Sequence, residues 1–156
     1  NHGALLPQVK GGASLVWGRM LNSGVWGISI MQIDKEIDSG RILISKKFKY
    51  NNTCNEEEFV KIADDLTVSA LIEVLTSSIQ EIENTSWDIK LPKHIDSLKA
   101  IKILEYAFKN DFSIYMPTRT PLDSLVKKEW TDQFKEVFKV ANNSPYPKWI
   151  ENENSK

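Results

Sequence analysis

The spacing of apolar residues changes along the chain and predicts alternating helices and strands. Residues 13–21, ASLVWGRML, follow Pro7 and two glycines and fit a short helix. Residues 25–33, VWGISIMQI, are rich in β-branched and aromatic side chains and predict a buried strand. Residues 41–50 alternate apolar and polar positions, which predicts a second strand paired with the first and a bulge at residues 46–47. The polar residues 34–40 between the two predict a loop.

Helical spacing dominates the rest of the chain. Asn55 predicts the cap of a long amphipathic helix, because three glutamates follow it and apolar positions then recur over nearly thirty residues: Phe59, Ile62, Leu66, Ala70, Val74 and Ile82. Asp96 predicts the cap of a second helix with apolar positions Leu98, Ile101, Leu104 and Phe108. A third is expected from about Thr131, with Phe134, Val137, Phe138 and Ala141. Residues 110–124 and 142–149 break this pattern, and the tail 151–156 is expected to be disordered.

A change of composition near residue 90 predicts two parts. Residues 83–94, ENTSWDIKLPKH, leave the long helix and carry Trp87 and Pro92 in a polar context. We therefore expect an α/β part at residues 1–90 and a small C-terminal subdomain at residues 91–156. Nothing in the spacing indicates that the second part folds alone.

Charge and cysteine content narrow the classes of partner. Lys and Arg number 20 and Asp and Glu 21, a formal net charge of −1, so no basic footprint favours nonspecific binding to nucleic acid or an anionic membrane. The lone Cys54 cannot form an internal disulfide and has no metal-ligand spacing around it, which indicates a reducing, cytoplasmic setting without a metal. Because no apolar run approaches about 18 residues and no basic start leads into an apolar stretch, we expect neither a spanning helix nor a signal peptide.

Two motifs resemble the folate-dependent formyltransferases. Residues 2–7 read HGALLP and lead to Gly11 and Gly12, and residues 27–43 read GISIMQIDKEIDSGRIL. In that family a strand end reads Asn, any residue, His, then usually Pro-Ser-Leu-Leu-Pro, and a later loop closes with Asp-Thr-Gly before an Ile-Leu strand. His2 falls on the family's His and Asp38 on its catalytic Asp, and the order and separation of the motifs agree.

This resemblance implies both a fold and an activity. The expected fold class is α/β, as the second half of a formyltransferase-type open, mostly parallel sheet with flanking helices. The expected activity is transfer of a formyl group from 10-formyltetrahydrofolate to a primary amine. The resemblance makes His2 and Asp38 catalytic, and it assigns folate binding to the intervening loop, through Asp34, Lys35, Glu36, Ile37 and Gly40.

The resemblance also concerns residues outside the sequence. The family's catalytic Asn would precede Asn1, so the chain resembles the second half of a larger enzyme whose N-terminal half is its partner. A cleft built from two halves loses contacts when one is absent, so we expect this chain alone to bind folate poorly and to turn over no substrate. A rival hypothesis is a non-catalytic packing unit that forms a homodimer through uncovered apolar surface.

Formyl transfer needs two placed groups. Negative charge develops on the formyl oxygen while the attacking amine loses a proton. An imidazole can donate a hydrogen bond to that oxygen, and a carboxylate can hold the ring and accept the proton. Asp34 and Asp38 each also suit a simple turn, since Asp side chains bond nearby backbone amides; the motif favours catalysis for Asp38. Trp26 is expected in the core rather than on a ligand platform.

A second resemblance concerns the amine. Residues 115–124, YMPTRTPLDS, Trp130 and residues 138–149 are similar to motifs of formyltransferases that act on nucleotide-linked amino sugars, although Leu122 stands where they carry Glu. This resemblance implies an amino-sugar substrate. Methionyl-tRNA is the alternative, against which the absence of a Lys/Arg-rich patch counts. Arg119 and Asp123 either form a local ion pair that shapes a turn or contact the substrate.

Overall fold

The computed structural model describes residues 1–143 and 148–151, which form short strands and four α-helices. The elements in chain order are β1 (Val9–Gly11), α1 (Ser14–Leu21), β2 (Val25–Met31), β3 (Ile42–Lys49), α2 (Glu56–Thr76), β4 (Ile89–Lys90), α3 (Ser97–Lys109), β5 (Ile114–Met116), the 3-10 helix η1 (Pro121–Ser124), β6 (Leu125–Val126), α4 (Asp132–Ala141) and β7 (Ile150–Glu151). No helix in the described ranges has the length and apolar content to cross a membrane. The tail predicted to be disordered lies, from residue 152 on, outside those ranges.

The strands confirm the expected α/β class with mostly parallel pairing. In the largest sheet β5 lies between β1 and β4, and both pairings are parallel. β6 and β7 also pair in parallel, whereas β2 and β3 pair antiparallel, as the sequence predicts. The predicted bulge at residues 46–47 is wrong: the register shifts between Ile30 and Met31 instead. Lys46 and Lys47 keep the regular register, and both polar side chains are accommodated in it: the Lys46 ammonium reaches Glu73 at 2.5 Å and Lys47 is exposed.

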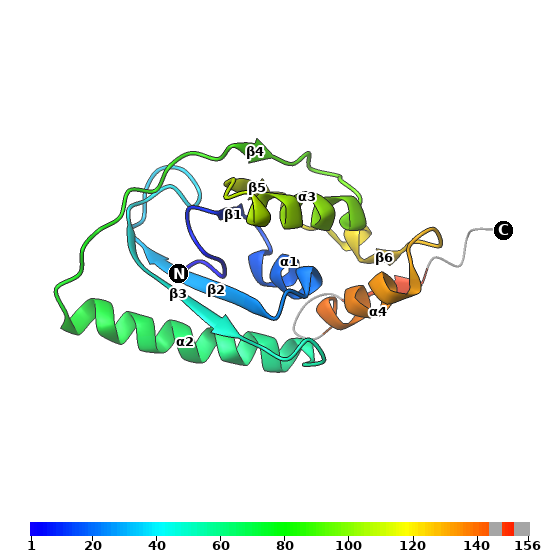
Figure 1. Ribbon diagram of the computed structural model, residues 1–156, viewed down its shortest axis with the longest axis horizontal. Helices are drawn as coiled ribbons and strands as arrows, with labels where there is room; N and C mark the ends of the chain where they lie inside the picture. The colour runs from blue at the N-terminus through cyan, green and yellow to red at the C-terminus, as the bar shows by residue number, and fades with distance from the viewer. Residues whose placement is uncertain (144–147, 152–156) are drawn as a thin grey trace.

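The long helix α2 covers the β2–β3 hairpin (Figure 1). Asn55 caps it as predicted: its side chain accepts from the Glu58 amide, and the Glu58 carboxylate accepts from the Asn55 amide. The helix ends at Thr76, so the prediction that it continues to Ile82 is wrong. Ser77 leaves helical geometry, and Ile82 exchanges two backbone hydrogen bonds with Ile42, which a helical Ile82 could not make.

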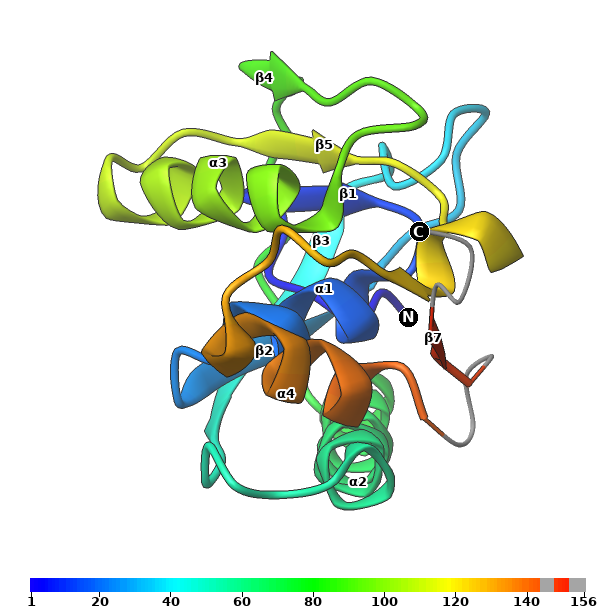
Figure 2. The same cartoon turned by 90° about the vertical axis from the view of Figure 1, so that its right-hand side faces the viewer.

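The core joins segments from both sides of residue 90. Trp26 of β2 is 1% exposed and its ring stacks on Phe108 of α3 at 5.5 Å, which confirms it as a core residue. Figure 2 shows α1 between α3 and α4, and Trp17 of α1 is likewise buried.

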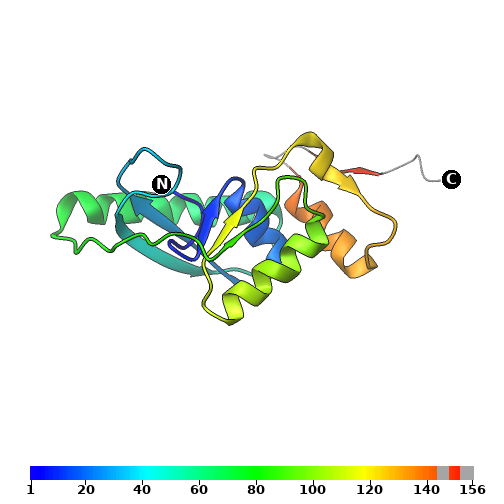
Figure 3. The same ribbon diagram turned by 90° about the horizontal axis from the view of Figure 1, so that it is seen from above.

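Asp96 and Thr131 cap α3 and α4 as predicted. Figure 3 shows α4 and β6 at one end of the molecule and the last turn of α2 at the other. The division into two parts near residue 90 stays a prediction.

Candidate functional site

His2 is fixed by strand pairing. Its amide donates to the Ser29 carbonyl of β2 at 2.8 Å, and the Ser29 amide donates to the His2 carbonyl at 2.9 Å. The Leu6–Pro7 peptide bond ahead of β1 is cis. β1 lies beside His2, since the Val9 carbonyl oxygen is 2.8 Å from Nε2 of His2. The His2 side chain is 6% exposed. Two backbone hydrogen bonds to Ser29 therefore fix the position of His2 against β2.

Asp38 meets His2 at the end of β1. Its Oδ1 atom lies 3.3 Å from Nδ1 of His2, and its Oδ2 atom accepts from the Gly11 amide at 2.8 Å. The Nε2 atom of His2 lies 2.8 Å from the Val9 carbonyl oxygen. Val9 and Gly11 therefore hold the two ends of the pair through backbone groups of one short strand. The structure brings together the two residues that the motif singled out, although they are far apart in sequence.

The His2 ring lies between two acceptors. The Val9 carbonyl can only accept, so Nε2 donates to it, and the contact between Nδ1 and Asp38 needs a further proton. His2 and Asp38 share that proton, so it is not assigned to either residue alone. Burial lowers the pKa of His2 below its ordinary value, while Asp38 and the Val9 carbonyl act in the opposite direction. Both ring nitrogens are occupied inside the chain, so donation to a formyl oxygen requires Nε2 to leave the Val9 carbonyl.

Lys10 adds a buried cation that sequence reasoning missed. It lies between Val9 and Gly11, is 2% exposed, and donates from Nζ to the Thr85 carbonyl at 2.5 Å. Burial lowers its pKa, while the negative charges of Asp38 and Glu36 raise it. Lysines are rarely buried, so the residue type gave no indication of a buried position. Its position inside the HGALLPQVKGG stretch was the only signal in the sequence.

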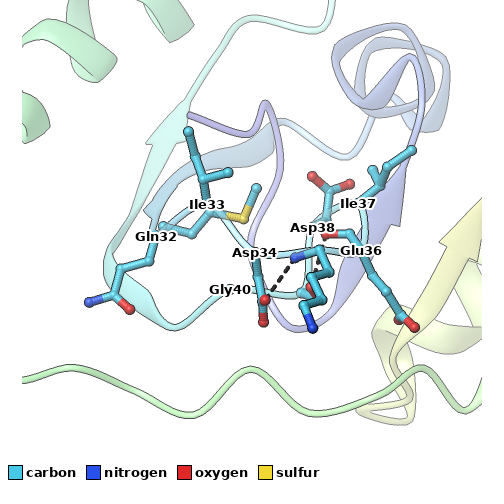
Figure 4. A pocket seen from close by; sticks show the side chains of 10 residues that line it. Gln32, Ile33, Asp34, Glu36, Ile37, Asp38 and Gly40 are labelled. Atoms are coloured by element: carbon cyan, nitrogen blue, oxygen red, sulfur yellow. Dashed lines mark hydrogen bonds between the residues drawn. The ribbon is translucent and has the colours of Figure 1, made fainter.

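The loop predicted to bind folate lines a pocket of about 260 Å³ formed by residues 31–40 (Figure 4). That volume falls below the roughly 300–1,000 Å³ of complete ligand pockets. Its apolar side chains have little cover: Ile33 is fully exposed and Ile37 is 70% exposed. Asp34 accepts from the Lys35 amide at 2.7 Å, and the Glu36 carbonyl accepts from Ser39. The loop therefore covers only one side of the pocket that it lines.

Gly40 closes the loop for a steric reason. A Cβ atom there would lie 1.9 Å from the Gln32 carbonyl oxygen, so only glycine lets the two ends of the loop approach. Asp38 has a φ of 55°, a left-handed conformation that few non-glycine residues adopt. The loop is therefore sharply constrained at the residue that faces His2.

Arg119, from the motif at residues 115–124, forms contacts within the chain. Its guanidinium donates to the Asp123 carbonyl at 2.5 Å and to the Asn142 side chain at 2.7 Å, and it lies over the Trp17 ring at 5.0 Å. Of the two alternatives for Arg119, the structure has the local contact with Asp123, but to its carbonyl, because the Asp123 carboxylate accepts from the Thr120 amide and hydroxyl. Burial lowers the pKa of Arg119 to about 10. Residues 144–147 of the same motif lie outside the described residues.

Comparisons with known proteins show which sequences and folds the chain resembles. No family model matches the chain. A curated methionyl-tRNA formyltransferase from Prochlorococcus marinus subsp. pastoris is 26% identical over 113 residues, which are 72% of this chain and 34% of the relative. The solved methionyl-tRNA formyltransferase from Clostridium thermocellum has a TM-score of 0.69 at 16% identity, over 98% of this chain and 56% of that one. HypX from Aquifex aeolicus, solved with tetrahydrofolic acid, has a TM-score of 0.63 at 14% identity, over 92% of this chain and 22% of that one.

The fold is that of the formyltransferases, and the chain spans only part of the proteins it matches, 34% of the first curated relative and 56% of the first solved structure. The expected resemblance is found at the level of similarity: the sequence is similar to methionyl-tRNA formyltransferases, and the fold is shared with solved formyltransferases. The roles assigned to individual residues stay predictions.

Proposed function

We propose that the full protein transfers a formyl group from 10-formyltetrahydrofolate to a primary amine, and that this chain supplies the His2–Asp38 pair and the folate loop. The observation that carries the proposal is the buried contact between His2 and Asp38, 3.3 Å apart, since Asp38 is also one of the residues that line the pocket. A formyltransferase-like fold around that contact supports the reaction class.

The pair has a defined part in this chemistry. Asp38 orients the ring and passes the proton that the attacking amine releases, directly or through water, to the folate nitrogen that departs as its bond to the formyl carbon breaks. His2 donates from Nε2 to the developing negative charge on the formyl oxygen once it leaves the Val9 carbonyl. The exposed Ile33 and Ile37 offer apolar cover to the pterin, and the loop backbone between them meets its polar edge.

The loop binds folate from one side only in this proposal. The pocket of about 260 Å³ has a single wall, and the matched regions are only 34% of the curated relative and 56% of the solved structure, which supports a second wall in the rest of the protein. Calorimetric titration of the 156-residue chain with a stable folate analogue tests this point. Micromolar or tighter binding would show that the loop alone suffices.

Two amines compete as the acceptor. The motif at residues 115–124 supports a nucleotide-linked amino sugar, and the name of the curated relative supports methionyl-tRNA. Arg119 is buried and bonded within the chain, so it supports neither choice. Measuring formyl transfer by the full-length protein to each amine in parallel separates them, and transfer to neither would contradict the proposed reaction.

The remaining expectations concern setting and assembly. The free Cys54 supports a reducing, cytoplasmic location. A homodimer stays a prediction, for which the exposed apolar side of α2 is the motivation; it includes Val68, Ile72 and Leu75. Sedimentation across a range of concentrations tests it, and a monomer at every concentration would contradict it.

A further inference from the structure

A strap of residues 81–85 crosses the loop that carries Asp38. It belongs to the segment between α2 and β4, which runs past the loop and pairs with β3 through the Ile82–Ile42 bridge (Figure 1). At one end of the strap Glu81 accepts from Gln32 at 2.7 Å and from Arg41 at 3.0 Å, which are the two ends of the loop. At the other end the Thr85 carbonyl accepts from Lys10. The strap thus joins the loop ends to β1.

Asn84 contacts the centre of the loop. Its Nδ2 group donates to the Asp38 carbonyl and to the Gly40 carbonyl, each at 2.9 Å. The orientation of this amide is fixed, because a flipped side chain would place its oxygen against two carbonyl oxygens. One side chain thereby satisfies the backbone on both sides of Ser39.

These two bonds join a residue in an uncommon backbone conformation to the strap. A left-handed φ at a residue other than glycine costs about 1 kcal/mol or more and persists only where surrounding contacts fix it. At Asp38 the φ of 55° directs the carboxylate to Nδ1 of His2 and to the Gly11 amide. The Asn84 side chain is the one described group that bonds the backbone carbonyls of both Asp38 and Gly40 through its own donors.

We propose that Asn84 is a positioning residue: by bonding the Asp38 and Gly40 carbonyls it keeps the Asp38 carboxylate against His2. This inference rests on the proposed function for its effect on turnover. Its geometric content, that the Asp38–His2 contact depends on Asn84, does not need that function.

The first test is an NMR titration of the histidines in the 156-residue chain, which has only His2 and His94. The charged groups that act on His2 are Asp38, Lys10 and the Asn1 amino group. Asp38 favours the charged ring, so in Asn84→Ala the pKa of His2 should fall by at least about half a pH unit, towards its value in Asp38→Asn. The signal of the exposed His94 is the internal reference.

A matched control and a double variant separate positioning from general loosening. Asn110→Ala removes the same kind of bond, from Nδ2 to the Tyr106 carbonyl at 2.8 Å at the end of α3, and should leave His2 unchanged. In an Asp38→Asn background, Asn84→Ala should cause no further shift, because its effect passes through Asp38. An unchanged His2 pKa in Asn84→Ala, or an equal shift with and without Asp38, would overturn the proposal.

The second test is turnover by the full-length protein. Asn84→Ala should lower kcat roughly tenfold to a hundredfold and leave KM for the amine nearly unchanged, the pattern of a displaced catalytic group. A raised KM with an unchanged kcat would contradict the positioning role. If the wild-type protein transfers no formyl group, the proposed function fails, and the His2 titration still decides the role of Asn84.

Discussion

Replacing Glu56 by Gln is expected to stabilise the protein at neutral pH. Glu56 is the first residue of α2 and is 1% exposed, and among the described residues neither carboxylate oxygen has a hydrogen-bond partner. The nearby Arg19 guanidinium instead donates to the Asn52 and Cys54 carbonyls. Burial therefore raises the pKa of Glu56 from 4.5 to about 8, while the charge of Arg19 acts in the opposite direction.

The sign of the pH effect follows from this raised pKa. The folded state holds the proton more tightly than the unfolded chain, so the free energy of unfolding falls as pH rises from about 4.5 and levels off above about 8. At pH 7 the cost is about 3 kcal/mol, an upper limit because an outward movement of the side chain restores solvation. Gln imitates the neutral acid and does not titrate, so Glu56→Gln should gain up to this amount at pH 7 and at most about 1 kcal/mol near pH 5.

Urea unfolding followed by tryptophan fluorescence at pH 5, 6, 7 and 8 measures the effect. Glu57→Gln is the matched control, since it removes the same charge one residue further on, where the side chain is exposed. That variant should lose a few tenths of a kcal/mol through the helix dipole, with little dependence on pH. Parallel pH profiles for Glu56→Gln and the wild-type protein would refute the reasoning.

Three further substitutions test the site. Gly11→Ala should destabilise the protein by about 2 kcal/mol or more in thermal unfolding, because the Gly11 φ is 96° and the new Cβ would lie 2.0 Å from the Met116 carbonyl oxygen; wild-type stability would contradict this. Ile37→Ser should weaken folate-analogue binding by the full-length protein with a stability change within about 0.5 kcal/mol, and unchanged affinity would count against the loop. Asp34→Asn should keep near-wild-type kcat, since its contact is a local turn bond.

The local elements of this protein could be predicted because local rules determine them. Asn55, Asp96 and Thr131 each precede a helix and each side chain accepts from an amide three residues on, which is a property of nearby sequence. The end of α2 could not be predicted in this way. The apolar Ile82 continues the helical spacing, but its backbone pairs with Ile42, a residue forty positions earlier.

The candidate site shows the same limit. The motif resemblance indicated His2 and Asp38, which the fold brings together. Lys10 and Asn84 had no such signal, because their roles depend on contacts with residues 85 and 38, which are distant in sequence. A buried lysine and a turn-forming asparagine look like surface residues until the chain is folded around them.

The central claim is that Asp38 works with His2 in formyl transfer, and single-turnover transfer from 10-formyltetrahydrofolate by the full-length protein tests it most directly. Asp38→Asn nearly preserves shape and should lower the rate roughly 10² or more, and His2→Asn should do likewise. The double variant should lose little beyond either single variant, because the two side chains in contact act as one unit. A near-wild-type rate for Asp38→Asn, with a rate lost in Asp34→Asn instead, would contradict the account.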